Sequence, residues 1–139
     1  MTRIWERLYL GDLKDAQQLV RSNPQRISTV IALCREQPSR KAPGITYIRI
    51  PISDSCPISS QQFEDIMFAI AVGLRRGNVL VHCFAGMSRS PVLMAAWLHR
   101  CGYAALEKAL SEIARQRKIA ASDVLLQSVM QLSSIRARE

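Results

Sequence analysis

A cysteine and an arginine six residues apart, Cys83 and Arg89, lie in a segment whose local pattern favours anion chemistry. The apolar run at 78–81 is typical of a buried strand, and Pro91 suits the first turn of a helix. The loop between them, residues 84–89, can turn its backbone N–H groups inward beside the helix N-terminus and form a nest for an anion. Such a nest stabilises a thiolate, and an arginine offers two parallel N–H donors to phosphoryl oxygens. The segment therefore predicts a nucleophilic sulfur beneath a bound phosphate.

A longer signature runs through the same segment: His-Cys-x-x-Gly-x-x-Arg-Ser, at His82, Cys83, Gly86, Arg89 and Ser90. This pattern resembles the signature of the cysteine-dependent protein tyrosine phosphatase superfamily, and its Ala-Gly-x-Ser-Arg-Ser ending resembles the dual-specificity branch in particular. The resemblance extends over nearly the whole chain, from Leu-Tyr-Leu-Gly at 8–11 to the last helices. It implies a compact phosphatase catalytic domain that needs no cofactor and no metal.

The resemblance implies four catalytic roles: Cys83 as nucleophile, Arg89 as phosphate clamp, Asp54 as general acid and base, and Ser90 in the loss of phosphate from the cysteine. Asp54 stands on a loop 29 residues before Cys83 (83 − 54), where the family carries its acid. Asp54 could instead cap a turn, as aspartate often does, whereas the other nearby candidate, Asp65, falls within an amphipathic helix. Ser90 could instead cap the following helix.

The residues expected to line the phosphate site are Phe84, Ala85, Gly86, Met87, Ser88 and Arg89. Gly86 suits both a tight turn and a close approach of the backbone to phosphate. His82 is expected to hydrogen-bond the loop backbone and to support the thiolate indirectly, not to act as a general base. The loop thus supplies the nucleophile and the groups that hold the phosphate.

The sequence says less about the substrate. Family members with a deep pocket favour phosphotyrosine, and this chain shows no insertion to wall the pocket in, so phosphoserine and phosphothreonine should also reach Cys83. Relatives that act on phosphoinositides often carry lysine or arginine where this chain has Phe84 and Met87, which weakens the lipid alternative without removing it. RNA 5′-phosphates stay open because the chain is basic. Phosphorylated proteins are the expected substrates.

Two other classes of protein share parts of this pattern. A rhodanese-type sulfurtransferase also places a cysteine in an anion-binding loop after a strand, but it needs neither Asp54 nor the Ser-Arg-Ser-Pro ending. A non-catalytic phosphate-binding module usually lacks the cysteine or the arginine, and both are present here. The phosphatase prediction is preferred over both.

The remaining cysteines raise the question of redox chemistry. Without C-x-x-C spacing and with only two histidines, the cysteines indicate reduced thiols and no zinc site. Cys34 ends the strand expected beside the Cys83 strand, and the resemblance implies that a cysteine there can pair reversibly with the nucleophile. Cys34 could instead be a buried small hydrophobe. Cys56 is a second candidate partner, and the sequence does not rank the two.

Strands and helices alternate along the chain. Strands are expected as two short pieces within 4–10 and then at 27–34, 45–50 and 78–81. Helices are expected at 12 to about 21, 59–77, from Pro91 to 102, from about 105, and from a cap at Ser122. This order predicts an α/β fold, with a central, mostly parallel sheet of about five strands flanked by helices on both faces.

Length and composition bound these expectations. A chain of 139 residues, 48% hydrophobic and 22% charged, reads as a single globular domain spanning 1–139. No apolar run reaches membrane-spanning length and the first residues lack a secretion signal, so we expect a cytoplasmic protein. The net charge of +8 suits an anion site, but basic residues are not interleaved with aromatics, which argues against a nucleic-acid partner. The oligomeric state stays open.

One departure from the family pattern concerns the approach to the last helix. Relatives commonly carry a Pro-Asn pair there, and this chain has Ala-Ala-Ser at 120–122. The departure puts the geometry of that loop in doubt and leaves the chemistry unchanged.

Overall fold

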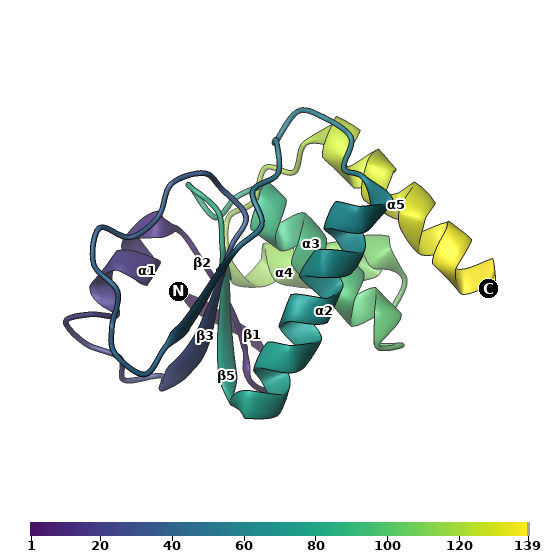
Figure 1. The fold of residues 1–139 in the computed structure, drawn as a ribbon. Helices are drawn as coiled ribbons and strands as arrows, with labels where there is room; N and C mark the ends of the chain where they lie inside the picture. The colour runs from purple at the N-terminus through teal and green to yellow at the C-terminus, as the bar shows by residue number, and fades with distance from the viewer. Residues whose placement is uncertain (139) are drawn as a thin grey trace.

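The fold is a five-stranded sheet with one helix on one face and four on the other (Figure 1). The computed structural model describes residues 1–138. Its strands are β1 (Thr2–Trp5), β2 (Leu8–Gly11), β3 (Ile27–Ala32), β4 (Thr46–Arg49) and β5 (Asn78–His82). Its helices are α1 (Leu13–Gln18), α2 (Ser60–Arg76), α3 (Arg89–Arg100), α4 (Leu106–Gln116) and α5 (Asp123–Arg138). The predicted α/β class is confirmed.

The strands lie in the order β1-β2-β5-β3-β4. Only the β1–β2 pair is antiparallel, and the other three pairs are parallel. Register places Gly11 and Ala32 on either side of His82, so three parallel strands end at one edge of the sheet. Because loops after parallel strands gather at this edge, the residue after His82 emerges at a natural ligand site.

Both faces of the sheet are covered, but unequally. One small cluster joins α1 to the sheet through Ala16, Leu19, Val30 and Leu80. The main core lies on the other face, where α2 to α5 pack (Figure 1). β5 is central, and Val79, Leu80 and Val81 are fully buried, which contributes about 1.5–3 kcal/mol for each side chain. A strand buried on both faces holds the cysteine that follows it in a fixed position.

Local sequence signals set most element ends. Ser59 and Gln62 form the expected capping box of α2, and Gly77 ends that helix. The expected cap of the last helix is also present, since Ser122 Oγ accepts a hydrogen bond from the Leu125 N–H at 3.4 Å. These ends were predictable because each depends on residues close together in the chain.

β4 is one residue shorter than predicted at each end, and β1 begins at Thr2 instead of within 4–10. Two further elements end earlier than predicted. α1 ends at Gln18 rather than near Arg21, because the Leu19 N–H bonds the Ala16 carbonyl and the chain tightens into a turn. β3 ends at Ala32 rather than at Cys34. The Leu33 N–H still bonds the His82 carbonyl, but the Leu33 carbonyl accepts from Ile52 in an incoming loop instead of from β4. Tertiary contacts therefore decide both ends.

Candidate active site

Cys83 lies directly after β5 and before a short loop that leads into α3. Its side chain is 2% exposed, and its Sγ lies 3.2 Å from Ser90 Oγ. Ser90 sits in the first turn of α3 and is itself fully buried. The expected junction of strand, loop and helix is present, with the thiol at its base.

The loop over Cys83 turns its carbonyls toward neighbouring elements. The Phe84 carbonyl accepts from the Leu13 N–H at 3.1 Å, and the Met87 carbonyl accepts from the Ala120 N–H at 2.7 Å. Within the described residues, no backbone N–H from 84 to 88 donates a hydrogen bond. These donors, together with the unsatisfied N–H groups of the first α3 turn, are available to an anion.

Gly86 occupies the tightest point of the loop. Its φ is +70°, in the left-handed region that favours glycine. A Cβ at this position would lie 2.7 Å from the Gly11 carbonyl oxygen and 2.8 Å from Arg117 Nη2. The loop therefore packs so closely against β2 and Arg117 that glycine is required.

The capping alternative for Ser90 is wrong. Ser88 is the residue at the N-cap of α3, and Ser90 lies inside the first turn with its hydroxyl turned to Cys83. The Ser88 hydroxyl accepts from the Ser122 N–H at 2.9 Å. Ser88 thus fastens the loop to residues 120–122, and Ser90 is left to interact with the sulfur.

Arg89 connects the loop to the segment that carries Asp54. Its Nη1 donates to the Ile52 carbonyl at 3.2 Å. Asp54 follows two residues later in an exposed turn. The Arg89 side chain therefore contacts the segment that leads into the turn of Asp54, although the two segments are far apart in sequence.

His82 is fully buried beneath the loop. Its Nδ1 lies 3.2 Å from the Cys83 carbonyl, which can only accept, so Nδ1 carries the proton. Nε2 is buried and has no partner among the described residues. Burial lowers the pKa of His82 below its usual range, so the ring is neutral near pH 7. The expected hydrogen bond between His82 and the loop backbone is present.

The structure distinguishes the two other cysteines near the predicted site. Cys34 is fully buried, and burial is the main cause that raises the pKa of its thiol to about 11. The charge of Arg89 lowers the pKa of Cys34 and that of Cys83 raises it, both by less than burial does. Register pairs Ala32 with His82, so Cys34 and Cys83 follow adjacent strands at the same edge of the sheet. Cys56 is exposed on the loop after Asp54. All four cysteines are free.

Sequence reasoning missed the residues that support the loop from outside. Arg117 Nη1 donates to the Leu10 carbonyl at 2.8 Å, and its guanidinium lies against Gly86. Leu13 and Ala120 bond loop carbonyls through backbone N–H groups that carry no side-chain signature. Only the replacement of Pro-Asn by Ala-Ala-Ser at 120–122 marked one of these places. The substituted loop still reaches Met87 and Ser88.

The described part of the chain shows neither a metal-binding cluster nor a membrane-spanning helix. No group of three or more His, Cys, Asp or Glu residues among 1–138 could hold a metal ion. No helix in the same range is long and apolar enough to cross a membrane.

The mostly parallel sheet thus leads to a buried thiol beneath a loop whose amides have no acceptor among the described residues, followed by an arginine. Residues 8–135 match the family described as "Dual specificity phosphatase, catalytic domain". The chain belongs to this family of dual specificity phosphatase catalytic domains.

Individual relatives agree with this assignment. Mouse dual specificity protein phosphatase 15 is 34% identical over 122 residues, which cover 86% of this chain and 52% of the relative. The human protein of the same name is 40% identical over 93 residues, covering 66% of this chain and 31% of that protein. A crystal structure of DUSP15 superposes with a TM-score of 0.84 at 29% identity, covering 99% of this chain and 90% of that one. The chain spans about half or less of the length of these curated relatives.

Proposed function

We propose that the protein is a phosphoprotein phosphatase that hydrolyses phosphotyrosine, phosphoserine and phosphothreonine monoesters through a phosphocysteine intermediate. The arrangement around Cys83 carries the proposal. A buried sulfur lies 3.2 Å from the Ser90 hydroxyl, beneath a loop whose N–H groups have no acceptor among the described residues. The family match supports the same activity and does not favour a sulfurtransferase.

In the first step the Cys83 thiolate attacks phosphorus in line with the leaving oxygen. Asp54 gives its proton to that oxygen, so the alcohol or phenol leaves neutral. The phosphoryl group is now bonded to sulfur. Arg89 and the loop amides hold the equatorial oxygens, which carry the charge in the transition state.

In the second step a water molecule attacks the phosphocysteine. The Asp54 carboxylate takes a proton from this water, which returns Asp54 to its acid form, and phosphate leaves as the S–P bond breaks. Ser90 is placed to donate its hydroxyl hydrogen to the departing thiolate. The net reaction converts monoester and water into alcohol and phosphate.

Two side chains at the loop influence the choice of substrate. Phe84 is 56% exposed and offers an apolar surface to the residue that carries the phosphate. Met87 is also apolar, and neither side chain offers the positive charge that a phosphoinositide headgroup needs. This composition supports phosphoproteins over lipids. A reducing compartment such as the cytoplasm suits the chemistry because Cys83 acts only as a reduced thiolate.

The test is hydrolysis of p-nitrophenyl phosphate by the purified protein without added metal, with vanadate as inhibitor. The Cys83→Ser variant should be inactive, because the thiolate is lost. Asp54→Ala should retain binding and lose at least about a hundredfold in kcat, which is the usual contribution of a general acid. An active Cys83→Ser variant, or Asp54→Ala activity equal to that of the wild type, would contradict the assigned roles.

A further inference from the structure

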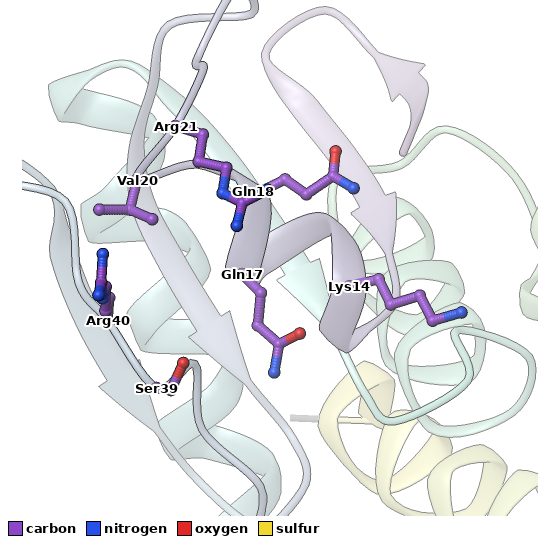
Figure 2. A pocket seen from close by; sticks show the side chains of 7 residues that line it. All are labelled: Lys14, Gln17, Gln18, Val20, Arg21, Ser39 and Arg40. Carbon is purple, nitrogen blue, oxygen red and sulfur yellow. The ribbon is translucent and has the colours of Figure 1, made fainter.

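A surface hollow of about 460 Å³ is lined by residues outside the loop of Cys83 (Figure 2). One side is formed by α1 and the turn after it, which supply Lys14, Gln17 and Arg21. The other side is the connection between β3 and β4, which supplies Ser39 and Arg40. Figure 2 shows Ser39 and Arg40 on one side of the opening and Gln17 on the other, whereas the Lys14 side chain extends away from Ser39 and Arg40 in this view. We call this feature the cationic hollow.

The charge of the cationic hollow is positive and unneutralised. Lys14, Arg21 and Arg40 line it, and no aspartate or glutamate does so among the described residues. None of these three cations belongs to an ion pair found within residues 1–138. Asp15, the carboxylate of α1, is occupied by the Met1 amine at 2.9 Å and by the Asp12 N–H at 3.0 Å. The hollow therefore attracts anions.

One wall of the hollow adjoins the active-site loop directly, and the other follows the strand beside β5. Leu13, which precedes Lys14, donates its N–H to the Phe84 carbonyl. The opposite wall continues from Cys34, which follows β3 at the edge of the sheet where Cys83 follows β5. Lys14 thus lies one residue from a backbone contact with the Cys83 loop.

We propose that the cationic hollow binds an acidic segment of the phosphoprotein whose phosphorylated residue occupies the Cys83 loop. This inference rests on the proposed phosphatase function and adds a preference among its substrates. Amide and hydroxyl groups from Gln17 and Ser39 complement carboxylates beside the three cations. No aromatic side chain lines the hollow, so it lacks the stacking surface that single-stranded RNA uses.

The experiment compares kcat/KM for two sets of phosphotyrosine peptides, one with glutamate and one with glutamine in the flanking residues on both sides of the phosphotyrosine. The test variant is Lys14→Gln/Arg21→Gln/Arg40→Gln. The matched control, Arg3→Gln/Arg75→Gln/Lys108→Gln, removes the same charge at exposed positions outside the hollow. All three proteins should hydrolyse p-nitrophenyl phosphate equally, because none of these residues belongs to the Cys83 site.

The wild type and the control should prefer the glutamate peptides. In the test variant the ratio of kcat/KM for glutamate over glutamine peptides should be at least about threefold smaller, because that is the least that three exposed ion pairs give. The preference should also fall in 1 M salt. Equal preference in the test and control variants would overturn the inference. So would a test variant that loses activity only on phosphoinositide vesicles or on RNA 5′-phosphates. A wild type inactive on p-nitrophenyl phosphate would overturn the proposed function, and this inference with it.

Discussion

Replacing Gly86 with alanine tests whether close packing beneath the loop holds the active site together. Two separate costs follow from the structure. The φ of +70° is left-handed, which costs an L-residue about 1–2 kcal/mol. The new Cβ would also lie 2.7 Å from the Gly11 carbonyl oxygen. The Arg117 guanidinium, 2.8 Å away, can shift because it ends a flexible side chain, but the Gly11 backbone is fixed in β2.

The two costs are additive because they have different causes. Forcing a methyl group into a packed site typically costs about 1–3 kcal/mol, so the Gly86→Ala protein should lose about 2–5 kcal/mol in free energy of unfolding. For a chain of this size, the Tm should fall by about 3 °C for each kcal/mol. If the loop shifts to relieve the contact, kcat/KM should fall by about a hundredfold, since a displacement of about 1 Å has that effect.

Two other glycines provide matched controls. Gly44 has a φ of +81° and Gly102 a φ of +82°, and a Cβ at either would meet no atom within 4 Å. Gly44→Ala and Gly102→Ala should therefore lose only the backbone cost and keep full activity. Urea denaturation and p-nitrophenyl phosphate hydrolysis measure both effects. If Gly86→Ala is as stable and as active as Gly102→Ala, the close contact with β2 has no energetic consequence and the reasoning fails.

Three further predictions concern buried groups around the same site. Burial lowers the pKa of His82, while the same histidine in the unfolded chain takes up a proton near pH 6.5. The Tm should therefore fall as pH drops from 7.5 to 5. His82→Asn should reduce the slope of Tm against pH. An unchanged slope would show that His82 titrates alike in both states. Mild peroxide should oxidise Cys83 to a sulfenic acid, which should condense with the Cys34 thiol to a disulfide and release water. Dithiothreitol should therefore restore activity in the wild type and in Cys56→Ser, but less in Cys34→Ser. Equal recovery in Cys34→Ser would exclude Cys34 as the resolving thiol. Arg117→Met removes the hydrogen bond to the Leu10 carbonyl and should lower the free energy of unfolding by about 1.5–3 kcal/mol, measured by denaturant titration. Unchanged stability would mean that water replaces this bond.

The segment around Cys83 could be predicted from sequence because its structure depends on neighbours in the chain. The buried strand, the small-residue loop and the helix start occupy consecutive residues, so pattern and propensity are enough to identify them. The capping box at Ser59 and the cap at Ser122 were found for the same reason. The α/β class followed from the alternation of strands and helices.

The tertiary structure alone decided which distant groups surround the sulfur. It joined Arg89 to the segment of Asp54 through the Ile52 carbonyl, and it buried Cys34 while leaving Cys56 exposed. The supports from Leu13, Ala120 and Arg117, and the facing walls of the cationic hollow, were equally invisible in the sequence. Such contacts depend on strand order and register, which bring together backbone groups that no residue type identifies. Local chemistry is therefore encoded in adjacent residues, whereas its surroundings depend on how the whole sheet is assembled.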